Sequence, residues 1–176
     1  MRTASLILSL VLTLVWVIVP DCGVFALSAH DPVWWHHVSY MFMHASLLHL
    51  LSNVWFLLTF AFLFRSLKWQ VWICCALIAL IMPSGYSEGM VGISGMLYAL
   101  SGFGILYCRR KLRSVILMGI LMSVQMALGH VAVIFHLKCL LAAVCIAVFF
   151  FPVLSHSQIR DSQNPSKSRN PDPSKS

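Results

Sequence analysis

The sequence has 176 residues, of which 60% are hydrophobic and only 10% are charged, and its mean hydropathy is +0.86. A chain this apolar has too little polar surface for a water-soluble domain. Its net charge of +7 comes from short basic clusters between apolar runs, which argues against a nucleic-acid-binding surface. The composition therefore predicts an integral membrane protein.

Six apolar runs follow one another along the chain and predict an all-α membrane protein, a bundle of six transmembrane helices. The runs cover residues 3–20, 44–64, 69–83, 92–108, 113–128 and 131–152. We expect a membrane domain over residues 1–154, followed by a polar cytoplasmic tail over residues 155–176. The tail is rich in Pro and Ser, a composition typical of disorder.

The first run also resembles a secretory signal, because Arg2 precedes it and the small residues of "FALSA" follow it. Its length favours a retained helix, since the apolar part of a signal usually has about 7 to 15 residues. Cleavage, the alternative, would leave the orientation of the other helices unchanged.

The basic residues predict how the helices are oriented. Arg2 precedes the first run, and the other clusters lie between runs two and three, between runs four and five, and after run six. Of the twelve Lys and Arg residues, only Lys138 falls elsewhere. Because basic residues collect in cytoplasmic loops, both termini are predicted to be cytoplasmic.

Polar residues inside apolar runs are costly and therefore informative. The second run contains "HASLLHLLSN", in which His49 and Asn53 are four residues apart and share a helix face. His44 precedes His49 by five residues and would project about 140° away on a helix, so the three should not form one cluster. His49 and Asn53 together could donate hydrogen bonds to a developing oxyanion.

The fourth run begins with "GISGMLYALSG", in which Gly92 and Gly95 flank Ser94 and Tyr98 lies one turn further on the same face. Small residues at helical spacing usually serve close helix packing, and a serine among them is more often a packing residue than a nucleophile. The alternative is an activated hydroxyl, which requires a nearby base.

The sixth run supplies a candidate base. His136 heads a stripe of small residues that matches the stripe of the fourth run. The small residues are Gly95, Ala99 and Gly102 in the fourth run and Cys139 and Ala143 in the sixth. If the stripes face each other, the Ser94 hydroxyl and the His136 imidazole come within hydrogen-bond reach.

His130 is the alternative base, since "GHVAVIFHL" contains two histidines. The positions three and seven residues after His130 are Val133 and Leu137, which are too bulky for close helix approach, so His136 is favoured. Lys138 is a more distant third candidate, because it would point away from Ser94 if His136 points toward it.

These segments together resemble the rhomboid family. "HASLLHLLSN" is similar to the rhomboid pattern of His, four residues, His, three residues, Asn. "GISGMLYALSG" resembles the rhomboid Gly-x-Ser-Gly with its following aromatic residue, and "FHLKCLLAAV" resembles the histidine motif of the sixth helix. "WWHHVSYMFMH" is similar to the segment that leads into the second helix. The matches appear in the family's order over about residues 34–145.

The resemblance implies a six-helix rhomboid-like bundle and an intramembrane serine endopeptidase that works without a cofactor or metal. It implies Ser94 as nucleophile, His136 as base, an oxyanion hole of His49, Asn53 and the Ser94 backbone N–H, Tyr98 stacked on the base, and a structural His44. Gly92 and Gly95 would support the serine. The implied partners are membrane proteins with helix-destabilised transmembrane segments and the lipid bilayer.

The chain departs from the family pattern before the second helix and in the sixth helix, where Lys138 also has no expected counterpart. His36 follows Trp35 where family members usually have Arg, which leaves the anchoring of this segment open. Cys139 and Ala143 stand where the sixth helix usually has Gly, which would place helices four and six slightly further apart.

Two other functions remain open. A catalytically inactive rhomboid-like protein that binds transmembrane helices would use the same fold, although inactive relatives typically lack the serine or the base. A metal or haem protein is disfavoured, because no supporting carboxylate lies in the runs. The short tail and the lack of a further domain predict a bacterial inner-membrane protein.

Overall fold

The computed structural model describes residues 2–19, 21–28, 33–64, 69–83, 89–107, 115–116, 119–120, 122–124, 127 and 132–163. The long helices are α1 (Arg2–Ile18), α3 (Leu47–Leu63), α4 (Trp69–Ile81), α5 (Ser94–Tyr107) and α7 (Val133–Gln163). Three short helices precede α3: η1 (Gly23–Phe25), α2 (His36–Ser39) and η2 (Tyr40–Phe42). Within the described ranges there is no strand, only an isolated bridge between Leu27 and Met90, so the all-α class is confirmed.

The second predicted run differs from the structure at its start. The run begins at residue 44, but α3 begins only at Leu47, because Ser46 has an extended backbone (φ −153°, ψ 160°). Half of the run predicted over 113–128 lies outside the described residues. α7 continues past residue 154 to Gln163, and the division between membrane domain and tail stays a prediction.

In the described part of the chain, no helix alone combines the length and apolar character needed to cross a bilayer. The segments His36–Phe42 and Leu47–Leu63 meet these criteria only as a pair, and they are bent by 90° relative to each other. The number of spans and the side on which each terminus lies therefore stay predictions.

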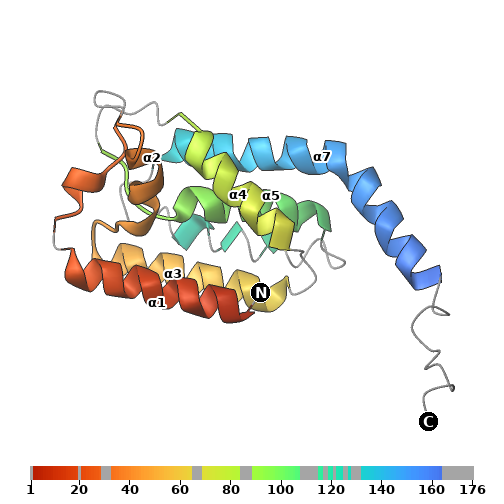
Figure 1. The fold of residues 1–176 in the computed structure, drawn as a ribbon, viewed down its shortest axis with the longest axis horizontal. Helices are drawn as coiled ribbons and strands as arrows, with labels where there is room; N and C mark the ends of the chain where they lie inside the picture. Colours follow the sequence, from red (N-terminus) through yellow and green to blue (C-terminus); the bar gives the residue numbers. More distant parts are fainter. Residues whose placement is uncertain are drawn as a thin grey trace, which may run out of the picture.

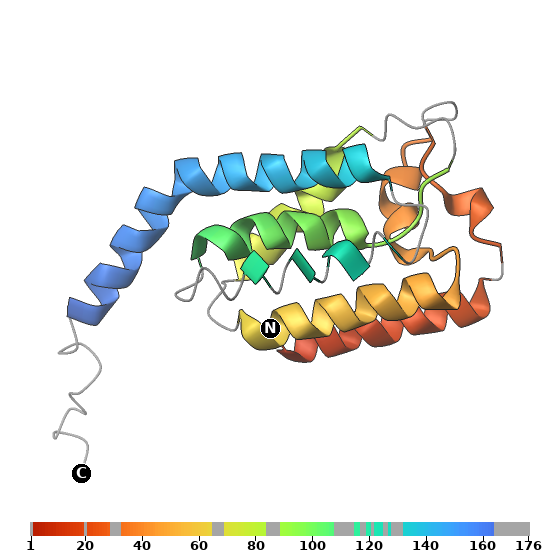
Figure 2. The same ribbon diagram turned by 180° about the vertical axis from the view of Figure 1, so that it is seen from behind.

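The helices form two groups that meet around α5. α1 lies alongside α3, and α7 runs along α5, as both views of the ribbon show (Figures 1 and 2). α4 contacts both α5 and α7. This arrangement brings the first turn of α5 beside the first turn of α7, although the two lie far apart in the sequence.

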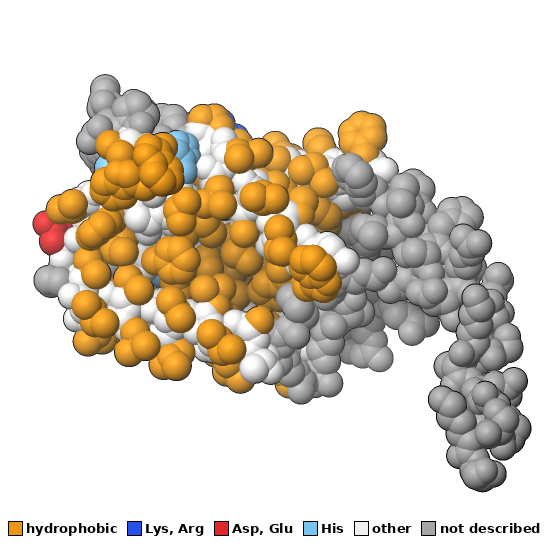
Figure 3. Space-filling view, in the orientation of Figure 1, with side chains coloured by type: hydrophobic (Ala, Val, Ile, Leu, Met, Phe, Trp, Pro, Cys, Tyr) orange, Lys and Arg blue, Asp and Glu red, His pale blue; other side chains and the backbone are white. Residues whose placement is uncertain are grey.

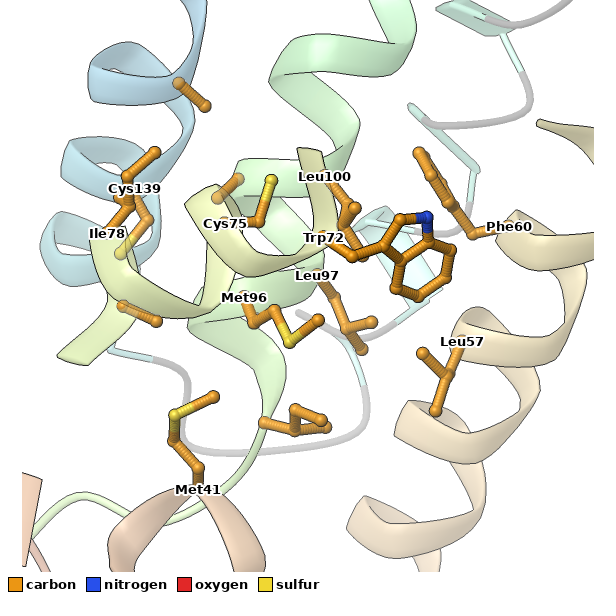
Figure 4. Packing of buried hydrophobic residues seen from close by; sticks show 14 of the residues in the cluster. Met41, Leu57, Phe60, Trp72, Cys75, Ile78, Met96, Leu97, Leu100 and Cys139 are labelled. Atoms are coloured by element: carbon orange, nitrogen blue, oxygen red, sulfur yellow. The ribbon is translucent and has the colours of Figure 1, made fainter. Parts of the chain in front are cut away.

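The core is built where α3, α4 and α5 face one another. Leu57 and Phe60 from α3 point toward Trp72 of α4 and toward Leu97 and Leu100 of α5 (Figure 4). All five side chains are buried. Burying this apolar surface and packing it closely holds α5 between its neighbours.

The outer surface is also apolar. Large hydrophobic side chains are exposed along the long helices, among them Leu6, Leu51, Leu77 and Leu141. Orange apolar atoms cover most of the described part of the face seen in Figure 3. A continuous surface of this kind suits contact with lipid and not with water.

Glycine makes the contact between α5 and α7 unusually close. A Cβ added at Gly102 would lie 2.7 Å from the Leu140 backbone oxygen and 3.0 Å from the Ala143 Cβ. Cys139 and Ala143 are both fully buried. Close helix contact is therefore compatible with Cys and Ala at positions where the family usually has Gly.

Ser46 caps the N-terminus of α3, because its side chain accepts a hydrogen bond from the His49 backbone N–H at 3.1 Å. We expect Ser46→Ala to lower the free energy of unfolding by about 1 kcal/mol, since that N–H loses its partner. Thermal unfolding in detergent would measure this. Ser46→Asp, which can still accept the bond, is the control and should unfold near the wild-type temperature.

Candidate active site

Ser94 is the first residue of α5, and the turn before it depends on glycine. Gly92 has φ +115°, a backbone conformation that residues with a Cβ rarely adopt. Its N–H donates to the Tyr40 backbone oxygen at 2.8 Å. The turn therefore fixes where α5 begins and where the Ser94 side chain lies.

Ser94 and His136 meet across the contact between α5 and α7. The Ser94 Oγ lies 2.6 Å from the His136 Nε2, and the two residues are only 7% and 6% exposed. A neutral imidazole that accepts at Nε2 carries its proton on Nδ1. In that tautomer the serine hydroxyl donates to a group that can take its proton.

The His136 ring is held by aromatic packing. The Tyr98 ring stacks on it, with centroids 4.4 Å apart and planes 24° from parallel. The Phe135 ring contacts it edge-on, with centroids 5.8 Å apart. Among the described residues, nothing forms a hydrogen bond with His136 Nδ1. Ser94 and His136 thus have the geometry of a catalytic dyad.

His49 and Asn53 lie beside the turn that leads to Ser94. A Cβ added at Gly92 would lie 2.9 Å from the His49 Nε2 and 3.5 Å from the Asn53 Nδ2. Asn53 is fully buried. Two side chains with donor nitrogens therefore converge on the backbone next to Ser94, a geometry suited to holding an oxyanion.

The prediction that His44 lies apart from His49 is wrong. The two rings lie edge to face with their centroids 5.2 Å apart. The helical projection does not apply, because α3 begins after Ser46 and His44 precedes it on non-helical backbone. His44 is buried, and its predicted structural role stays a prediction.

Gly95 allows the base helix to approach the serine helix. A Cβ at Gly95 would lie 2.6 Å from the Phe135 Cε1 and 3.5 Å from the Ala79 Cβ. Phe135 precedes His136 and is almost fully buried. The Phe135 ring thus occupies the space beside Gly95, directly before the candidate base in the sequence.

A comparison with protein-family models matches the Rhomboid domain over residues 31–153. The chain belongs to the rhomboid family. Searches of curated proteins and of solved structures give no significant match. The matched range contains every candidate site residue, whereas α1 lies before it. A rhomboid domain indicates an integral membrane protein, and the family, which includes serine intramembrane proteases and inactive members, acts on membrane proteins within the bilayer.

The structure describes one of the two alternative bases of this rhomboid. His130, the alternative base, lies outside the described residues. Lys138 lies on α7 and is half-buried. Within the described ranges, no three His, Cys, Asp or Glu side chains gather in a way that could hold a metal ion.

The structure adds Tyr40 and Phe135 to the surroundings of the rhomboid site. Neither was predicted as a site residue from the sequence, because a hydrogen bond to the Tyr40 backbone oxygen does not depend on residue type. Only one feature of the sequence points to Phe135, namely that it directly precedes the candidate base His136.

Proposed function

We propose that this rhomboid is an intramembrane serine endopeptidase that cleaves transmembrane segments of membrane proteins, with Ser94 as nucleophile and His136 as general base. The observation that carries the proposal is the 2.6 Å contact between Ser94 Oγ and His136 Nε2. Burial of both side chains supports it, because a buried hydroxyl bonded to an imidazole is protected from competing water.

In the proposed reaction, His136 Nε2 takes the hydroxyl proton as the Ser94 Oγ attacks the carbonyl carbon of the scissile bond. His49, Asn53 and the Ser94 backbone N–H stabilise the negative oxygen of the tetrahedral intermediate. His136 then gives its proton to the leaving amine, which leaves an acyl-enzyme. Water attacks the acyl carbon as His136 takes its proton, and His136 returns this proton to Ser94 Oγ when the acid product leaves. The Tyr98 ring keeps the imidazole in the orientation required for both transfers.

We propose that substrates are membrane proteins whose transmembrane helices are easily unwound. A helical peptide bond is shielded and its carbonyl is already hydrogen bonded, so the segment must open before attack. Gly or Pro near the cleavage site would favour opening. We further propose a six-helix membrane domain over 1–154 with both termini and the 155–176 tail in the cytoplasm, in a bacterial inner membrane.

Labelling by a fluorophosphonate probe tests the proposal. The purified protein in detergent should form a covalent adduct that is absent in Ser94→Ala and in heat-denatured wild type. Ser101→Ala is the matched control, because it removes another buried α5 hydroxyl, which donates to the Leu97 oxygen at 2.9 Å. Failure of folded wild type both to label and to cleave a helix-destabilised transmembrane reporter would favour an inactive, helix-binding rhomboid.

A further inference from the structure

The C-terminal end of α4 carries two backbone oxygens, of Ala79 and Leu80, that accept hydrogen bonds from side chains elsewhere in the chain. In a continued helix, the Ala79 oxygen would accept from the N–H of residue 83, but residue 83 is proline and has none. The Leu80 oxygen belongs to the last turn of the helix, which ends at Ile81. Pro83 thus ends α4 and frees these carbonyls for partners elsewhere in the chain.

Two side chains from the segment before α3 bond to these oxygens. The Tyr40 hydroxyl donates to the Ala79 oxygen at 2.8 Å. The His37 Nδ1 lies 2.9 Å from the Leu80 oxygen and must donate, because a carbonyl only accepts. Figure 1 shows α2 close to this end of α4. The segment His36–Phe42 is therefore fastened to α4 by side chains that cap its last turn.

Tyr40 also contacts residues that lie next to each member of the candidate dyad in the sequence. Its backbone oxygen accepts from the Gly92 N–H at 2.8 Å, two residues before Ser94. Its ring contacts the Phe135 ring edge-on, with centroids 6.2 Å apart, one residue before His136. Tyr40 is only 1% exposed. One anchored residue thus lies against the serine turn and against the start of the base helix.

We infer that Tyr40 is a positioning residue, whose hydroxyl, bonded to Ala79, fixes the distance between the Ser94 turn and His136. The inference rests on the proposed function, since it assigns Tyr40 to the geometry of that dyad. Without the hydroxyl bond, the segment keeps its packing but can shift, and the Gly92 turn shifts with it. A small displacement at reacting atoms has a large effect on rate.

Tyr40→Phe tests this inference, because it removes only the hydroxyl. We expect the maximal rate of fluorophosphonate acylation at saturating probe to fall about tenfold, with little change in the half-saturating concentration. Ser101→Ala is the control, since it also removes one buried bond from a hydroxyl to a backbone oxygen. An equal rate loss in both variants at equal melting temperature would overturn the inference.

A second measurement does not depend on activity. In protein with ¹⁵N-labelled histidine, the His136 Nε2 resonance, assigned with His136→Ala, should shift in Tyr40→Phe toward its position in Ser94→Ala. An unshifted resonance would overturn the role of Tyr40 even if wild type never reacts with the probe. A shifted resonance in unreactive wild type would support positioning while refuting the proposed protease.

His37→Phe provides a second route if Tyr40→Phe does not fold. It releases the same segment from the Leu80 oxygen and leaves the Tyr40 bonds in place. We expect a smaller change in the acylation rate and the His136 resonance, in the same direction. If neither changes, anchoring of this segment to α4 does not position the dyad.

Discussion

His136→Ala is expected to lower the rate of peptide-bond cleavage by at least about 1,000-fold, while the protein remains folded. Without the imidazole, the Ser94 hydroxyl has no group to take its proton during attack and none to protonate the leaving amine. The remaining donors would still bind an oxyanion, so a small residual rate is expected. Turnover of a transmembrane reporter in detergent micelles would measure the loss.

His130→Ala is the matched comparison, because it removes the other histidine of "GHVAVIFHL". We expect it to retain cleavage activity within about threefold, as a residue outside the reacting atoms would. Lys138→Ala should likewise remain active. Cleavage that survives in His136→Ala but disappears in His130→Ala would refute the assignment of the base. Melting temperatures of all three variants would exclude loss through unfolding.

The sequence allowed the contact between Ser94 and His136 to be predicted because it depends on residue size. Gly95 and Gly102 on one helix, with Cys139 and Ala143 on the other, leave room for backbones to meet, and close packing then follows from shape. The pairing of His49 with Asn53 could also be predicted, because residues four positions apart share a helix face. Both predictions use only the sizes of the residues and their spacing along one helix.

The position of His44 could not be predicted in this way. A helical projection assumes that the helix has already begun, whereas Ser46 is its cap and its backbone is extended. Serine at that position was visible in the sequence and is a common N-cap, so the signal existed but was outweighed by the apolar run. The error came from taking the start of hydrophobicity as the start of the helix.

The bonds of Tyr40 show a different limit. Its backbone oxygen and the Ala79 oxygen are present in every residue type, so no pattern of side chains indicates that they are used. Pro83 does indicate that α4 ends nearby and leaves carbonyls open, but not which residue fills them. Long-range contacts to backbone atoms must therefore be read from the structure.

Gly102→Val is expected to abolish probe labelling and to lower the free energy of unfolding by about 3 kcal/mol. The nearest obstacle to a side chain is the Leu140 backbone oxygen, which cannot move aside as a flexible side chain could. The two helices would have to separate at this point, and the separation would extend toward Ser94 and His136. Thermal unfolding and labelling of the same sample would measure both effects.

Gly119→Val is the control, because no atom of the described residues lies within 4 Å of a Cβ added at Gly119. It should label like wild type. The double variant Gly102→Ala/Ala143→Gly adds a sharper test. The second substitution removes the Ala143 Cβ, 3.0 Å from the new Cβ, but the Leu140 backbone oxygen stays at 2.7 Å. Only partial recovery relative to Gly102→Ala alone is then expected. Full recovery would mean that side-chain crowding, and not the close approach of the α5 and α7 backbones, keeps Ser94 against His136.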